Sequence, residues 1–131
     1  MPDNKESLYP KDWIEKARKD LRRVKVLLAD GDTEGAGFHL QQAIEKYLKA
    51  YLLLKGWKLK YIHDLPKLLN YAKDYDSDFE RFRIICEQVT EYYTPERYPF
   101  TEEILPEEEE IEEVLKKTEE LANKIEKESD C

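Results

Sequence analysis

The chain has 131 residues, of which 40% are hydrophobic and 11% aromatic, and its formal net charge is −8. This length suits a single domain over residues 1–131, and the apolar content is too high for a disordered chain. An acidic chain repels phosphate backbones at long range, which disfavours non-specific nucleic-acid binding, although the 15 Lys or Arg against 10 Asp or Glu in residues 1–73 leave room for a local basic surface.

The first predicted helix opens at Tyr9-Pro10, since proline is tolerated in the first turn of a helix. It ends at Asp30-Gly31-Asp32, where glycine suits the C-terminal cap. A second helix begins around Thr33, with Asp32 or Thr33 as its cap, and stops before Gly56. Apolar residues recur on the first helix at helical spacing and cover a wide face of the second, which predicts that the second lies at the centre of a bundle.

Residues 57–62 alternate apolar and polar side chains, and without a visible partner strand we predict an extended connection. Asp64 is a good cap for a short third helix, and a fourth follows Asp76-Ser77-Asp78. Residues 94–100 are predicted to form a loop, and a last helix begins near Pro106. The pattern therefore predicts an all-α fold, an antiparallel up-down bundle of four to five helices.

Composition also suggests where the protein works. There is no apolar run of about 18 residues, so we expect no membrane span, and the polar N-terminus lacks a signal core, which favours a cytoplasmic location. Two cysteines, Cys86 on an apolar helix face and Cys131 at the end, are too few for a disulfide framework. The 40% of charged residues, with few amides, are typical of a heat-adapted (thermophile) source.

Three motifs carry a family resemblance. Residues 38–50 read FHLQQAIEKYLKA on the predicted central helix, residues 62–65 read IHDL, and residues 97–99 read RYP after the fourth helix. In this order and spacing, they resemble the HEPN domain, the higher-eukaryote and prokaryote nucleotide-binding domain, over roughly residues 10–125. The resemblance implies a helical bundle that is usually a homodimer and is often encoded beside a minimal nucleotidyltransferase, sometimes as a toxin–antitoxin pair.

Other members of that family are metal-independent ribonucleases that use an Arg followed, after four to six residues, by a His. Here Arg97 would need His at positions 102–104, which hold Glu, Glu and Ile. The two histidines of the chain, His39 and His63, have no Arg five to seven residues before them. Because histidine supplies the proton-transfer group that titrates near neutral pH, we expect no ribonuclease activity of this kind.

The polar side chains within these motifs are the candidate ligand-binding residues. A polar stripe on the second helix offers amides that could bind a base edge and ammonium groups that could bind a phosphate. In the aromatic loop after the fourth helix, Arg97 could stack on a base or pair bidentately with a phosphate. Each set also has a purely structural explanation. Glu45 and Lys49 can form an ion pair along the helix, and Asp64 can cap the third helix while His63 packs on the second. Arg97 can pair with nearby acidic side chains. The candidates are Gln42, Glu45, Lys46, Lys49, His63, Arg97 and Tyr98.

We therefore expect a non-catalytic nucleotide-binding or regulatory module that partners a minimal nucleotidyltransferase and binds a nucleotide or RNA. No cluster of Cys, His and Asp has metal-ligand spacing, so neither a metal site nor a cofactor is predicted. Two alternatives stay open. One is a divergent ribonuclease in which Arg97 works with Glu102 or His63, and the other is a purely structural helical dimer without a ligand.

Overall fold

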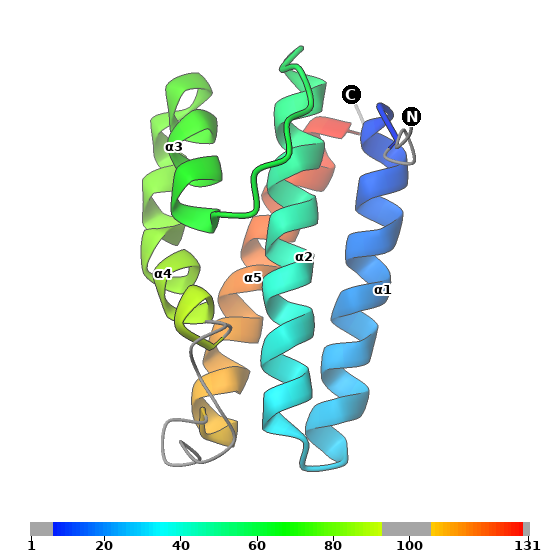
Figure 1. Ribbon diagram of the computed structural model, residues 1–131, viewed down its shortest axis with the longest axis vertical. Coiled ribbons are helices and arrows are strands. Elements are labelled where there is room, and N and C mark those ends of the chain that lie inside the picture. The colour runs from blue at the N-terminus through cyan, green and yellow to red at the C-terminus, as the bar shows by residue number, and fades with distance from the viewer. Residues whose placement is uncertain (1–6, 93–105, 130–131) are drawn as a thin grey trace.

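The regular structure of the described residues is helical throughout. A computed structural model describes residues 7–92 and 106–129, which form five α-helices and a short 3₁₀ segment before the fourth. Figure 1 shows the helices gathered into a bundle. The all-α fold predicted from the sequence is confirmed. In chain order the elements are α1 Pro10–Ala29, α2 Thr33–Leu54, α3 Leu65–Tyr75, η1 Ser77–Phe82, α4 Arg83–Tyr92 and α5 Glu108–Ser129.

The helix boundaries follow from local capping chemistry. The Asp32 carboxylate accepts a hydrogen bond from the Gly35 backbone N–H at 2.8 Å, and Asp64 accepts one from the Lys67 N–H at 3.1 Å. These bonds satisfy donors that the first turn of a helix leaves without a partner. Between α1 and α2, Gly31 has φ +82°, the left-handed conformation that glycine adopts without strain. The short link makes α1 and α2 antiparallel neighbours.

Helix α2 lies at the centre of the molecule, as its wide apolar face predicted. It packs against α1, α3, α4 and α5, and most of its middle turns are buried on all sides. Cys86 of α4 belongs to the same core, and burial raises the pKa of its thiol to about 12. The largest fully buried apolar side chains are Tyr47, Tyr51, Phe79, Phe82, Leu40, Ile44, Leu48, Leu52, Leu65, Leu68 and Leu69.

The connection between α2 and α3 returns along α2 instead of leading away from it. Residues 57–64 contain no helix or strand, which agrees with the extended connection expected from the sequence. Near its end the His63 ring lies 2.7 Å from the Glu45 carboxylate, well before the last turn of α2. Helix α3 therefore starts part-way along α2 and runs parallel to it, whereas α1 runs antiparallel to α2 (Figure 1). This return course brings the connection to the polar stripe of α2.

The predicted fourth helix forms in two parts. The Asp76 side chain accepts a hydrogen bond from the Asp78 N–H at 3.0 Å and starts the 3₁₀ segment η1, and α4 follows directly. Tight 3₁₀ turns are frequent at helix starts, and this one places Phe79 and Phe82 in the core. The predicted loop at residues 94–100, with Arg97 and Tyr98, lies outside the described residues.

Three helices meet at Glu126 of α5. Its two carboxylate oxygens accept hydrogen bonds from the Arg18 guanidinium of α1 at 2.8 and 3.0 Å, and the Tyr47 hydroxyl of α2 donates a third at 2.7 Å. Burial, and then the bond to this carboxylate, raise the pKa of Tyr47, so its hydroxyl remains a donor. The hydrogen bonds from Arg18 are the main reason that the pKa of Glu126 is lowered.

We expect Glu126→Gln to lower the free energy of unfolding at neutral pH by about 1–2 kcal/mol, since hydrogen bonds to a charged acceptor are lost. A carboxyl group with a depressed folded-state pKa stabilises the protein above its unfolded pKa, about 4.3 for Glu, and this contribution disappears as pH falls through the folded value. Urea titrations from pH 7 to pH 3 should therefore show the free energies of unfolding of the two proteins converging in acid.

Glu119→Gln, which breaks only the exposed pair with Lys25, is the control and should change stability by less than about 0.5 kcal/mol. A difference between Glu126→Gln and wild type that persists unchanged in acid would contradict the assignment.

Candidate functional site

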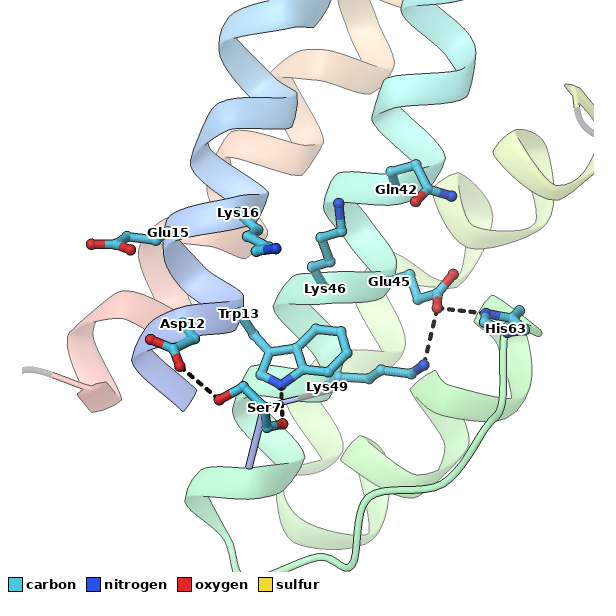
Figure 2. A pocket seen from close by; sticks show the side chains of 10 residues that line it. All are labelled: Ser7, Asp12, Trp13, Glu15, Lys16, Gln42, Glu45, Lys46, Lys49 and His63. Carbon is cyan, nitrogen blue, oxygen red and sulfur yellow. Dashed lines mark hydrogen bonds and ion pairs between the residues drawn. The ribbon is translucent and has the colours of Figure 1, made fainter. Parts of the chain in front are cut away.

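A pocket of about 530 Å³ opens between α1, α2 and the end of the connection that leads to α3. Figure 2 shows its lining, with the Trp13 ring at the base, the polar side chains of α2 along one wall and His63 at one edge. This volume lies within the range of small-molecule sites in proteins. The lining residues are Ser7, Asp12, Trp13, Glu15, Lys16, Gln42, Glu45, Lys46, Lys49 and His63.

The wall on α2 is the polar stripe that the sequence predicted. Gln42, Glu45, Lys46 and Lys49 recur every three or four residues, so a helix places them on one face. Gln42 donates one amide N–H to the side-chain oxygen of Gln41 at 2.8 Å. These side chains face α1 across the pocket, on a helix whose other faces are occupied by the core.

Glu45 is a buried carboxylate with two close partners. Its Oε2 atom accepts a hydrogen bond from the Lys49 ammonium at 3.0 Å and lies 2.7 Å from Nδ1 of His63. The Lys49 side chain is only 1% exposed and that of Glu45 is 9% exposed, whereas His63 is largely open to solvent. The ion pair predicted within the helix therefore forms, and Glu45 also fixes the His63 ring at the edge of the pocket.

A second buried carboxylate, Asp20 of α1, lies behind Lys46. Asp20 is 2% exposed, accepts a hydrogen bond from the Lys46 ammonium and lies 2.8 Å from Nδ1 of His39. Arg23 of α1 approaches the same carboxylate at 3.6 Å. Since a buried charge is tolerated when it is paired and hydrogen-bonded, Asp20 and Lys46 hold each other in place between the two helices.

Trp13 presents an aromatic surface to the pocket. Its indole N–H donates to the Ser7 carbonyl oxygen at 2.8 Å, and the Lys49 ammonium lies 5.4 Å from the ring centroid. With its one polar atom satisfied, the ring offers only π and apolar surface to a ligand.

The polar groups of the lining surround an aromatic ring. Within residues 7–92 and 106–129, no group of three or more His, Cys, Asp or Glu is arranged to hold a metal ion. The polar groups supply hydrogen bonds and one open cation, Lys16, which has no ion-pair partner among the described residues. An aromatic ring with a few convergent polar groups is the usual lining of a site for a small organic molecule.

The structure brings together five of the seven residues singled out in the sequence. Gln42, Glu45, Lys46, Lys49 and His63 line one pocket, while Arg97 and Tyr98 lie outside the described residues.

Six residues at or behind the pocket were not singled out as candidates from the sequence. Asp20 lies behind the pocket, and the other five line it, namely Ser7, Asp12, Trp13, Glu15 and Lys16. Asp20 did carry a signal, because it is an acid within the helical apolar stripe, three residues after Ala17 and four before Val24.

Outside the pocket, the helices carry no membrane signature. No helix in the described part of the chain is both long and apolar enough to cross a membrane.

Comparison with known proteins places this fold. The HEPN domain family matches residues 10–128. The crystal structure of an archaeal HEPN homologue has 24% sequence identity and a TM-score of 0.73, over 90% of this chain and 95% of that one. The crystal structure of TT1696 from Thermus thermophilus has 30% identity and a TM-score of 0.73, over 91% and 97% of the two chains. A search of curated proteins found no match. Since the family match spans nearly all the helical bundle, the chain belongs to the HEPN domain family.

Proposed function

We propose that this protein is a non-catalytic nucleotide-binding module that regulates a minimal nucleotidyltransferase, with the pocket between α1 and α2 as its ligand site. The observation that carries the proposal is the convergence of Trp13, Lys16, Gln42 and His63 on one pocket. An aromatic surface, an amide and a cation are the three kinds of group that recognise a base and a phosphate.

Charge supports a small ligand over a long nucleic acid. A chain with a net charge of −8 gains little from counterion release along a phosphate backbone. A pocket of this size instead suits a single nucleotide, whose recognition depends on a few close contacts. The lack of an Arg and His at the spacing of the family's ribonucleases supports the non-catalytic assignment.

The direct test is thermal unfolding with nucleosides and nucleotides at concentrations near millimolar. A ligand that binds only the folded state at about 100 times its Kd stabilises it by about 2.7 kcal/mol, which raises Tm by several degrees in a domain of this size. Lys16→Glu should reduce the shift given by a nucleoside monophosphate, because it reverses the charge of the unpaired cation. Lys19→Glu makes the same change on an exposed part of α1 outside the pocket and should leave the shift intact.

No shift with any nucleoside or nucleotide would refute ligand binding and favour the purely structural dimer. Metal-free cleavage of RNA that is lost in Arg97→Ala would instead support the divergent ribonuclease.

The proposal includes a homodimer and a nucleotidyltransferase partner, which the family membership suggests by analogy. Light scattering of the purified protein tests the dimer. A native pull-down from the source organism followed by mass spectrometry tests the partner, and recovery of a small nucleotidyltransferase is the expected result. Recovery of this chain alone would remove the regulatory part of the proposal and leave the ligand site to be judged by the thermal test.

A further inference from the structure

We infer that the pocket takes an adenine nucleoside carrying at most one phosphate, and that it disfavours nucleoside di- and triphosphates. This inference rests on the proposed nucleotide-binding function and narrows its ligand class. It comes from the state of each charged group around the pocket rather than from the number of lysines in its lining.

Two of the three lining lysines are already neutralised. Lys49 is buried against Glu45 at 3.0 Å, and Lys46 donates to the buried Asp20. Each ammonium would have to give up its ion pair with a buried carboxylate in order to reach a phosphate, and breaking a buried ion pair is strongly unfavourable. Lys16 is the lining lysine without a partner in the described parts of the chain.

Acidic groups offset this remaining cation. Asp12 and Glu15 line the α1 side of the pocket, and Glu15 is exposed without an ion-pair partner among the described residues. With His63 neutral, the three lining lysines balance the three lining acids, and behind them Arg23 balances Asp20. A triphosphate would bring several negative charges to a site whose own charge is close to zero, so no net positive field compensates for them.

A nucleoside monophosphate has suitable partners at the edge of the pocket. Lys16 provides the open ammonium group, and Figure 2 shows its side chain directed inward from α1. His63 directs its Nδ1–H to the Glu45 carboxylate, so in the neutral ring the other nitrogen is an acceptor for a ribose hydroxyl.

The base is recognised by uncharged groups. Gln42 uses one amide N–H on Gln41, and its carbonyl oxygen and second N–H have no partner in the described structure. A neighbouring acceptor and donor on one amide match the N6 and N7 edge of adenine, which glutamine recognises bidentately. The Trp13 ring at the base of the pocket provides a surface on which a purine can pack.

The test is isothermal titration of the full chain with adenosine, AMP, ADP, ATP and guanosine at one ionic strength. We expect AMP to bind at least as tightly as adenosine, ATP to bind about tenfold more weakly than AMP, and guanosine to bind more weakly than adenosine. Tighter binding with each phosphate added beyond the first would overturn this inference and leave the proposed function standing. No binding of any of the five would overturn both.

Two variants separate the charge argument from the base argument. Glu15→Lys should tighten ATP binding by about threefold or more while leaving adenosine unchanged, because it changes only the field at the pocket edge. Glu112→Lys makes the same charge change on the exposed face of α5 and is the control. Gln42→Leu should erase the preference for adenosine over guanosine, and retention of that preference would refute the role of the amide.

Discussion

Lys49→Met is expected to lower the free energy of unfolding by about 3 kcal/mol, because it leaves a buried carboxylate without its cation. The Lys49 side chain is 1% exposed and its ammonium lies 3.0 Å from Glu45. His63 still contacts Glu45, but its ring is largely open to solvent and does not replace the buried ammonium. Methionine retains the length of the side chain and a favourable contact with Trp13, so the loss reports mainly on charge.

The measurement is urea unfolding of four proteins, namely wild type, Lys49→Met, Glu45→Leu and the double variant. Replacing a whole buried ion pair by apolar residues is often close to neutral, so the double variant should recover most of the stability lost in Lys49→Met. Lys117→Met, in an exposed pair with Glu120, is the control and should cost less than about 1 kcal/mol. Equal losses in Lys49→Met and in the double variant would mean that the lysine acts through packing and not through its charge.

The helices were predictable because each carries its signal locally. A few neighbouring positions are enough to recognise the apolar stripe of α1, the Asp32 cap and Gly31 at the turn. The course of the connection was not predictable in the same way. Residues 57–64 have no helical period, and their return along α2 depends on where α3 packs, which involves residues distant in sequence.

The part of the candidate site that lies on α2 was predictable from the sequence, but its contacts with α1 were not. Periodicity alone placed Gln42, Glu45, Lys46 and Lys49 on one face of α2. Which side chains of α1 meet that face depends on the rotation of α1 about its axis, and this is set by the packing of the whole core. Asp20 therefore appears as the partner of Lys46 only in three dimensions.

Because contacts between helices cannot be read from periodicity, the number of lysines in the stripe overstates how many can bind a phosphate. From sequence, the lysines of the stripe suggested a site for phosphate. In the structure the two on α2 are committed to buried acids, and what remains for a ligand is Lys16 together with uncharged groups. The ligand that we propose is consequently a nucleoside or a nucleoside monophosphate, not a triphosphate.

Phe79→Ala is expected to destabilise the protein by about 3–5 kcal/mol, the usual loss when a large aromatic ring is removed from a close-packed core. Phe79 is fully buried, and its ring lies 4.5 Å from the Tyr51 ring of α2, with the Lys124 ammonium of α5 at 5.1 Å from its centre. It thereby joins η1 to both α2 and α5. For a domain whose whole stability is about 5–15 kcal/mol, this loss is a large share of the total.

Chemical denaturation followed by circular dichroism measures the effect, with Ile84→Ala as the control. Ile84 is 72% exposed and one turn away along the chain, so its truncation should change stability by less than about 0.5 kcal/mol. Since η1 and α4 both pack against α3, loss of Phe79 should also weaken binding of AMP, the proposed ligand, at temperatures just below unfolding, by depleting the folded population. A Phe79→Ala protein as stable as wild type would show that the aromatic contacts between η1 and α2 do not hold this layer in place.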